Sequence, residues 1–350
     1  MKYKLLGKTG LKVSELCLGT LTFGTEWGPL GADKENACKI WNTYIEAGGN
    51  FIDTANKYTE GTSEKWIGEF TKDDRDRYII STKYSLAMNL NDPNSSGNHR
   101  KNLFHSVKAS LKRLKTNYID FLWVHTWDYL SYIEEVMRAL DDLVKMGKVY
   151  HIGISNTPAW VVAEANTLAK EKGWTPFTAL QLQYNLLERS IERELLPLAR
   201  SRNLPVVAWS PLAQGVLTGK YLPECIEEKE RRRLEPNDPW GREYLIERNI
   251  PIVKEVIRIA EEIERIPAQV SLNWLLNKGI FPLIGARTND QMIENLDCLD
   301  FSLSKKHQKA LDKISSIKLG FPYDFFNNPL NKNNAYGNIL VEEMKTIFKN

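Results

Sequence analysis

Several features that commonly identify the class of a protein are scarce or missing in this chain of 350 residues. Its four cysteines, Cys17, Cys38, Cys225 and Cys298, include no C-x-x-C pair and no histidine at metal-ligand spacing, which disfavours a zinc site. No apolar run is long enough for a membrane span, and the amino terminus lacks the apolar stretch of a signal peptide. We therefore expect a cytoplasmic protein with reduced thiols, no metal and no membrane partner.

Neither sign of charge dominates the chain. The 47 basic and 44 acidic residues give a formal net charge of +3 and are scattered through the sequence. Because a nucleic-acid surface requires a concentrated basic patch, no nucleic-acid partner is expected. Hydrophobic residues make up 42% of the chain, enough for a large core. The length suits one large domain with insertions as well as it suits two domains.

Signatures of the common nucleotide-binding folds are also missing. No Gly-x-Gly-x-x-Gly follows the first apolar run and no phosphate-loop signature occurs, so a Rossmann mode of binding is not expected. The chain instead repeats short apolar runs separated by helical patterns. The runs predict strands at 16–19, 50–53, 78–82, 119–125, 150–154, 179–183, 206–209 and 281–284.

Helical patterns fill the intervals between these strands. They cover 34–47, 63–70, 102–114, 133–146, 158–172, 191–202, 251–263 and 268–278, with Asp33 and Ser63 as expected amino-terminal caps of the first two. Strands such as "FLWV" and "VVAW" are apolar on both faces, as a sheet covered by helices requires. We predict an α/β protein with a closed (β/α)8 barrel, the TIM barrel, and an open doubly wound sheet is the alternative.

Three segments lie outside the repeat. Residues 1–16 read as a β-hairpin that turns at 7–10 and can close one end of the barrel. Residues 213–249 form a long, charged and proline-containing loop, as lids and ligand clamps often do. The tail, residues 316–350, is aromatic without periodicity, and we expect it to fold back over the body. We expect one domain over residues 1–350.

Polar residues gather at the ends of the predicted strands, which in a (β/α)8 barrel form the mouth. Asp53, Lys83 and His125 end the second, third and fourth strands, and Tyr58 follows in the loop after the second. Neighbouring strands lie about 4.8 Å apart, so Asp53 can pair with Lys83, and the ammonium of Lys83 can lie beside the tyrosine hydroxyl. The remaining strand ends supply Gly19-Thr20, Ser155-Asn156, Gln181, Trp209-Ser210 and Gly285-Ala286-Arg287.

This grouping has a chemical logic. A tyrosine is a weak acid at neutral pH, and an adjacent cation is expected to lower its pKa toward the working range of a proton donor. His125 can hydrogen-bond a carbonyl oxygen and orient it. Each residue alone also fits a structural role, as an ion pair, a core histidine or a surface tyrosine. Four such residues at successive strand ends have no packing explanation, which favours a functional site.

The motifs at these strand ends resemble those of the aldo-keto reductases. They are "GGNFIDTANKYTEGTSEKWIGEF", "IISTKY", "YIDFLWVHTWD", "GISN", "LQLQYNLLER", "VVAWSPLAQGVLTGKY" and "PLIGARTNDQMIENL", in family order over residues 1–315. Among branches, "TFGTEWG" and "WVHTWD" resemble the reductases related to aryl-alcohol dehydrogenases and the potassium-channel β subunits. The resemblance implies NAD(P)H-dependent reduction of an aldehyde or ketone to an alcohol, without a metal.

The resemblance also implies a role for each site residue. Tyr58 would be the general acid, Lys83 its activating cation, Asp53 the partner of Lys83, and His125 the orienting group. For the nicotinamide it implies Thr20, Asp53, Ser155, Asn156, Gln181 and the stacking Trp209. The pyrophosphate and adenosine would lie along Ser210, Pro211, Leu212, Gln214, Gly215, Leu217, Lys220, Gly285, Ala286, Arg287, Gln291, Glu294 and Asn295.

Two departures from the family pattern concern the choice of cofactor. Arg287 suits the 2′-phosphate of NADP, but many members place a lysine at the Gly285 position and an arginine at the Gln291 position. We expect NADP, with NAD as the alternative. Aromatic residues that could line the substrate pocket are Trp27, Tyr84 and Trp127, with Trp240 or Phe325 as further candidates.

Two other function classes compete with the reductase. A cofactor-sensing regulatory subunit resembling the potassium-channel β subunits is the alternative, although His125 stands where those members carry asparagine. A barrel lyase or hydrolase would need a second acid at the neighbouring strand ends, which the sequence lacks. The sequence leaves the oligomeric state and the carbonyl substrate open.

Overall fold

A computed structural model of the chain describes residues 1–222 and 244–337. Within these residues, eight parallel strands close into a barrel in the order β10-β3-β4-β5-β6-β7-β8-β9. This confirms the predicted (β/α)8 barrel and excludes the open sheet. The strands are β3 (Cys17–Gly19), β4 (Phe51–Asp53), β5 (Ile79–Tyr84), β6 (Ile119–Val124), β7 (Val149–Ser155), β8 (Leu180–Gln183), β9 (Val206–Trp209) and β10 (Phe281–Ile284).

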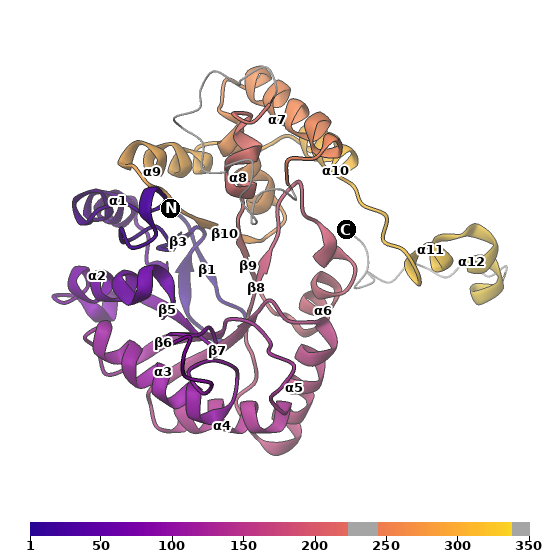
Figure 1. The fold of residues 1–350 in the computed structure, drawn as a ribbon. Helices are drawn as coiled ribbons and strands as arrows, with labels where there is room; N and C mark the ends of the chain where they lie inside the picture. Colours follow the sequence, from indigo (N-terminus) through magenta and orange to yellow (C-terminus); the bar gives the residue numbers. More distant parts are fainter. Residues whose placement is uncertain (223–243, 338–350) are drawn as a thin grey trace.

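Helices surround the barrel (Figure 1). The α4 helix shows why they pack there, because Val136, Leu140 and Leu143 recur at helical spacing and are buried on one face. No helix of the described residues is long and apolar enough to cross a membrane. The helices are α1 (Lys34–Glu46), α2 (Thr62–Phe70), α3 (Arg100–Arg113), α4 (Ile133–Lys145), α5 (Ala159–Lys172), α6 (Leu195–Arg202), α7 (Ile250–Glu262), α8 (Pro267–Asn277), α9 (Asn289–Leu296), α10 (Lys305–Ile314), α11 (Tyr323–Asn327) and α12 (Pro329–Tyr336).

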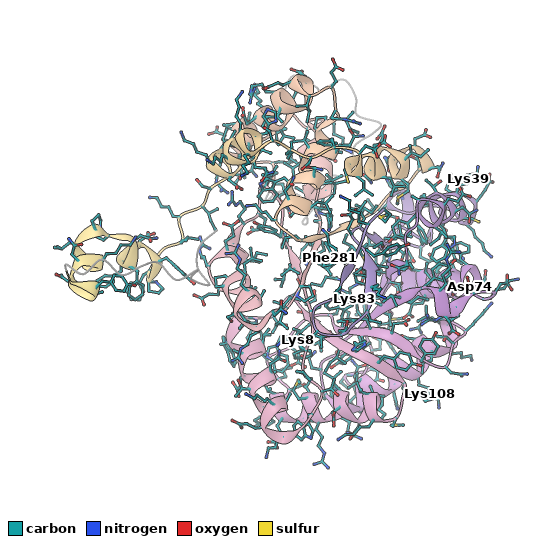
Figure 2. All side chains as sticks on the ribbon, turned by 180° about the vertical axis from the view of Figure 1, so that it is seen from behind. Lys8, Lys39, Asp74, Lys83, Lys108 and Phe281 are labelled. Carbon is teal, nitrogen blue, oxygen red and sulfur yellow. The ribbon has the colours of Figure 1, made fainter. Side chains whose placement is uncertain are left out.

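Alternation along the strands divides the core into two clusters. On β6, Phe121 and Trp123 belong to the cluster inside the barrel, whereas Leu122 and Val124 belong to the cluster between strands and helices. The same alternation puts Lys83 inside the barrel, while Lys39 and Lys108 lie on the surrounding helices (Figure 2). An inward residue near a strand's carboxyl end therefore faces the mouth.

The predicted hairpin is present and lies at the end of the barrel opposite the mouth. Strands β1 (Tyr3–Leu5) and β2 (Lys12–Ser14) pair antiparallel. Leu6 and Val13 are buried in the inner cluster with Phe51 and Phe281, which begin their strands. The turn contains Gly7 at φ +60°, where a Cβ would come within 2.7 Å of a Pro205 side-chain carbon. The hairpin thus seals the amino-terminal end.

The structure confirms one of the two expected helix caps, corrects the other, and describes part of the predicted long loop. Asp33 caps α1 as predicted by accepting from the backbone of Asn36, but Ser63 is the second residue of α2 and not its cap. The helix already begins at Thr62, so Ser63 lies inside its first turn. The hydroxyl of Ser63 donates to the carbonyl of Thr20. Within the predicted loop 213–249, residues 223–243 lie outside the described part of the chain.

The described part of the tail was wrongly predicted to fold back over the barrel. Helices α11 and α12 extend away from the body (Figure 1). Phe321, Phe326 and Leu330 are mostly exposed, because this segment has no helical apolar stripe to bury against the barrel. Two described hydrogen bonds link it to Arg193 of the body: the hydroxyl of Tyr323 donates to the carbonyl of Arg193, and the guanidinium of Arg193 donates at 3.1 Å to the carbonyl of Lys318. Residues 338–350 lie outside the described residues.

Candidate active site

The ends of β4 and β5 bring Asp53 and Lys83 together, as the sequence predicted. The ammonium of Lys83 forms an ion pair with Oδ2 of Asp53 and donates at 2.8 Å to the carbonyl of Thr54, and both charged side chains are fully buried. Burial disfavours the charge of Lys83, but Asp53 and Tyr58 outweigh it, so the pKa of Lys83 lies above its ordinary value. The lysine is a permanent cation at neutral pH.

Two further side chains hold the carboxylate of Asp53 from other strands. Ser81 on β5 donates to its Oδ1 at 2.7 Å, and Gln181 on β8 donates to the same atom at 2.9 Å across the barrel. Both carboxylate oxygens are therefore bound within the barrel. A buried charge with this many partners is held in one position.

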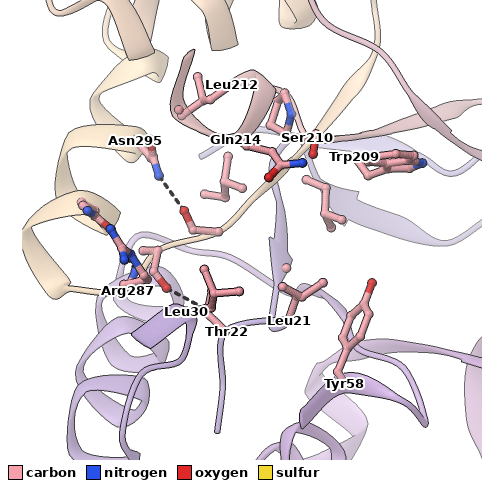
Figure 3. A pocket seen from close by; sticks show the side chains of 18 of the residues that line it. Leu21, Thr22, Leu30, Tyr58, Trp209, Ser210, Leu212, Gln214, Arg287 and Asn295 are labelled. Atoms are coloured by element: carbon pink, nitrogen blue, oxygen red, sulfur yellow. Dashed lines mark hydrogen bonds between the residues drawn. The ribbon is translucent and has the colours of Figure 1, made fainter. Parts of the chain in front are cut away.

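Tyr58 lies next to the cation at the floor of the mouth (Figure 3). The ammonium of Lys83 is 4.7 Å from the centroid of the tyrosine ring. Burial raises the pKa of Tyr58, and the charge of Lys83 offsets only part of this, so the pKa stays above its ordinary value. The prediction of a lowered pKa was therefore wrong. Sequence shows the neighbouring cation but not the loss of water around the phenol.

The loop that carries Tyr58 has an unusual backbone. Thr59, Glu60 and Gly61 all have positive φ, at 44°, 53° and 90°. The hydroxyl of Thr59 donates at 2.6 Å to the carbonyl of Phe23, which holds the turn. A Cβ on Gly61 would come within 2.8 Å of the Arg113 side chain, so glycine is required there. Strain of this kind is kept where the surrounding contacts fix it.

His125 directly follows β6 and faces Tyr58. The two rings meet edge to face with centroids 6.0 Å apart. Burial, with a contribution from the charge of Lys83, lowers the pKa of His125 to about 3. The ring is therefore neutral at physiological pH. Among the described residues its Nδ1 has no hydrogen-bond partner although it is buried.

A cavity of about 1520 Å³ opens above these residues. Figure 3 shows it running from Tyr58 past Trp209 to Arg287 and Asn295. Of the predicted site residues, its wall contains Trp27, Tyr58, His125, Asn156, Gln181, Trp209, Ser210, Pro211, Leu212, Gln214, Gly215, Lys220, Gly285, Ala286, Arg287, Gln291, Glu294 and Asn295. One continuous wall therefore joins the strand ends that the sequence identified.

Beside Tyr58, the wall carries the group predicted to hold a nicotinamide. The amide nitrogen of Asn156 donates to the carbonyl of His125 at 2.9 Å, and its oxygen accepts from the indole of Trp209 at 3.1 Å. Ser155 ends β7 just before Asn156 and does not itself line the cavity, and among the described residues its buried hydroxyl has no partner. An unpartnered buried hydroxyl next to a wall residue is suited to a polar ligand group.

The far end of the cavity is built from the loop after β10. The carbonyl of Ala286 accepts from the hydroxyl of Thr22 at 2.7 Å, and the carbonyl of Gly285 accepts from the amide of Asn295 at 3.2 Å. The side chain of Gln291 accepts from the backbone of Arg287 at 2.9 Å. The guanidinium of Arg287 donates at 3.4 Å to the carbonyl of Pro29. The loop backbone is thus anchored, while the guanidinium stands at the cavity wall.

Some predicted residues do not reach this wall. Tyr84 and Trp127 are buried in the core between strands and helices, and the hydroxyl of Tyr84 donates to the carbonyl of Asn98. Thr20 and Leu217 are buried and do not line the cavity, and Phe325 lies on the extended tail. Trp240 lies outside the described residues. Tyr84 follows the inward Lys83, so strand alternation turns it outward.

The sequence reasoning also missed several residues that do line the cavity. Leu21, Thr22, Leu86 and Thr126 follow strand ends by a few residues, and Lys57 precedes Tyr58. Leu21 and Thr22 lie in the loop after β3, Lys57 after β4, Leu86 after β5 and Thr126 after β6. This position was the signal that could have identified them. Residues 29–31 lie farther along the loop after β3, whereas Ala268 and Leu272 of α8 had no such signal.

Comparison with known proteins gives one consistent result. The model of the Aldo/keto reductase family matches residues 15–316. Norsolorinic acid reductase A of Aspergillus parasiticus is 36% identical over 329 residues, which cover 90% of this chain and 81% of the relative. Aldo-keto reductase ausK of Aspergillus calidoustus is 38% identical, covering 92% and 84%. Aryl-alcohol dehydrogenase [NADP(+)] of Phanerodontia chrysosporium is 36% identical, covering 91% and 86%.

Proposed function

The chain belongs to the aldo/keto reductase family, and from this premise we propose that it reduces an aldehyde or ketone to an alcohol with NADPH. The observation that carries the proposal is the grouping of Tyr58, Lys83 and a neutral His125 at the floor of one cavity. A protonated phenol beside a fixed cation is suited to giving a proton to a carbonyl oxygen.

The residues of the wall fit a nicotinamide cofactor. A bound cofactor of this kind supplies the hydride. Ser155, Asn156 and Gln181 would hold the carboxamide, and the ring of Trp209 would stack on the nicotinamide. The fit is supported by the buried hydroxyl of Ser155, which has no partner among the described residues. The loop from Ser210 to Lys220 and the anchored loop at Arg287 would hold the remainder.

Tyr58 acts as the general acid in this proposal. Its raised pKa keeps the phenol protonated at neutral pH, so the proton is available when negative charge develops on the carbonyl oxygen. The ammonium of Lys83 then stabilises the phenolate that remains. Asp53 keeps Lys83 charged and in place through their buried ion pair. His125, being neutral, can donate one N–H to the carbonyl oxygen and orient it.

Arg287 supports a preference for NADPH over NADH. Its planar guanidinium is suited to a phosphate, and it lines the far end of the cavity. The acids Asp290 and Glu294 line the same end and oppose a strong anion site. We therefore expect a modest preference. The relative whose name includes NADP(+) supports the same choice.

The test is a screen of aldehydes, ketosugars and aryl ketones with NADPH and with NADH, followed by loss of nicotinamide absorbance. Turnover of at least one carbonyl compound is expected, faster with NADPH. Tight cofactor binding without turnover of any compound would contradict the proposal and favour the cofactor-sensing subunit. Tyr58→Phe is the matched inactive control, since it removes only the donor hydroxyl.

A further inference from the structure

One charged residue at the mouth has no role in the proposed chemistry. Lys57 directly precedes Tyr58, lines the cavity and has a side chain that is 27% exposed. Of the described residues that line the cavity, three are cations, and the other two, Lys220 and Arg287, follow β9 and β10. Of these three cations, Lys57 is the one that shares a loop with the proposed proton donor, Tyr58.

The wall around Lys57 is otherwise mostly apolar. Leu21, Trp27 and Leu86 line the cavity from the loops after β3 and β5. The acids among the described lining residues, Asp290 and Glu294, both belong to α9, which adjoins Arg287. Among the described residues, a ligand next to Tyr58 would thus meet apolar side chains, a few neutral polar groups and the positive charge of Lys57.

Glu60 holds this arrangement at the rim. Its carboxylate accepts from the ammonium of Lys57 at 2.8 Å and from the indole of Trp27 at 3.3 Å. Its position depends on the positive φ of 53° in the loop after Tyr58. The Glu60 side chain is 45% exposed, and an ion pair this exposed is weak in water. Lys57 can therefore exchange part of this contact for an anion inside the cavity.

We propose that Lys57 selects carbonyl substrates that carry an acidic substituent, a carboxylate or an ionised phenol, on an apolar ring. The ammonium binds the anionic group, Leu21, Trp27 and Leu86 contact the ring, and Tyr58 and His125 receive the carbonyl oxygen. The inference rests on the proposed function, because it names the substrate class of the same site. Lysine suits this task, since its flexible stem lets one point charge reach anions of different placement.

The test compares substrates that differ in charge but hardly in size. Carboxybenzaldehyde and its neutral counterpart carbamoylbenzaldehyde, each as meta and para isomers, are reduced with NADPH, and the ratio of their kcat/KM values is measured. In Lys57→Met the ratio of acid to amide is expected to fall by about fivefold, the effect of losing one partly exposed charge pair. In Glu60→Gln the ratio is expected to rise, because Lys57 loses its competing carboxylate.

The chain offers a matched control. Lys39 forms a similar ion pair with Glu35, at 2.7 Å, on α1 and away from the cavity wall. Lys39→Met should leave the ratio unchanged. Raising the ionic strength should reduce the wild-type preference for the acid, because partly exposed charges are screened by salt.

The outcomes distinguish a failure of the inference about Lys57 from a failure of the proposed function. If the wild type reduces both aldehydes and Lys57→Met keeps the wild-type ratio, the inference is overturned and the proposed function stands. If the wild type reduces neither aldehyde nor any compound of the screen, the proposed function fails and the inference with it.

An independent readout is the binding of benzoate and benzamide to the NADP-loaded protein, followed by tryptophan fluorescence. A loss of benzoate affinity in Lys57→Met, with benzamide affinity kept, is the expected result, and equal losses for both contradict the inference.

Discussion

The two ends of the cavity differ in how their charged groups are held. At the Tyr58 end, the carboxylate of Asp53 is fully buried and is bound by Lys83, Ser81 and Gln181. At the other end, the guanidinium of Arg287 is partly exposed and donates at 3.4 Å to one backbone carbonyl. The first end is organised before any ligand binds. The second can adjust to what binds it, so mutations at the two ends should have different kinds of effect.

The largest expected effect is on turnover at the organised end. Tyr58→Phe removes the hydroxyl of the proposed proton donor and hardly changes the size of the side chain. We expect kcat to fall by about 10²- to 10⁴-fold, the usual contribution of a positioned general acid. Cofactor affinity, measured by fluorescence titration, should stay close to the wild-type value. Unchanged turnover would contradict the assigned role.

The second prediction concerns stability at the same end. Lys83→Met removes the cation and leaves the carboxylate of Asp53 buried and uncompensated. The free energy of unfolding, measured by denaturant titration, should fall by about 3–5 kcal/mol. The double variant with Asp53→Asn should recover part of this loss, because no buried charge then remains. A loss below about 1 kcal/mol would mean that the pair is not buried in solution.

A third prediction uses pH. The pKa of His125 is lowered to about 3 in the folded chain from the ordinary 6.5, so the unfolded chain takes up this proton first. Between pH 6.5 and about 3 the unfolded chain binds one more proton at this site than the folded chain. The free energy of unfolding is therefore fully kept above pH 6.5 and decreases as the pH falls toward 3. His125→Asn should therefore reduce the slope of stability against pH in this window, by up to about 1.4 kcal/mol per pH unit. Equal slopes in the two proteins would contradict a buried neutral histidine.

The smallest expected effect belongs to the adjustable end. Arg287→Gln should weaken NADPH binding by about tenfold, the loss expected for one charge-assisted contact to a phosphate. NADH binding is the internal control and should hardly change, because that cofactor lacks the phosphate. Thermal stability should also be close to wild type, in contrast to Lys83→Met. Equal weakening for both cofactors would instead indicate a structural role for Arg287.

Sequence reasoning succeeded where the barrel repeat fixes geometry. The apolar runs that end in Asp53, Lys83 and His125 predicted both the strands and their shared edge, because parallel strands in a barrel end at one mouth. The structure brings these residues together as expected. Their chemical roles stay a prediction that the variants above would test.

Sequence reasoning failed where a property depends on the three-dimensional surroundings of a residue. The raised pKa of Tyr58 reflects burial that no sequence pattern displays. The prediction that the tail packs on the barrel was wrong. Its aromatic residues are apolar enough to pack, but they lack the periodicity that would give one buried face. Lys57 was overlooked because a lysine in a polar loop looks like ordinary surface, and only the cavity wall shows where it lies.

The amino-terminal hairpin gives the two ends of the barrel different tasks. Leu6 and Val13 are buried with Phe51 and Phe281, which begin β4 and β10, and they shield this end of the inner core from water. The described cavity lies at the opposite end, where Tyr58 and Arg287 follow these two strands. The start of the chain thereby leaves one end of the barrel for ligands and makes the other a purely structural base.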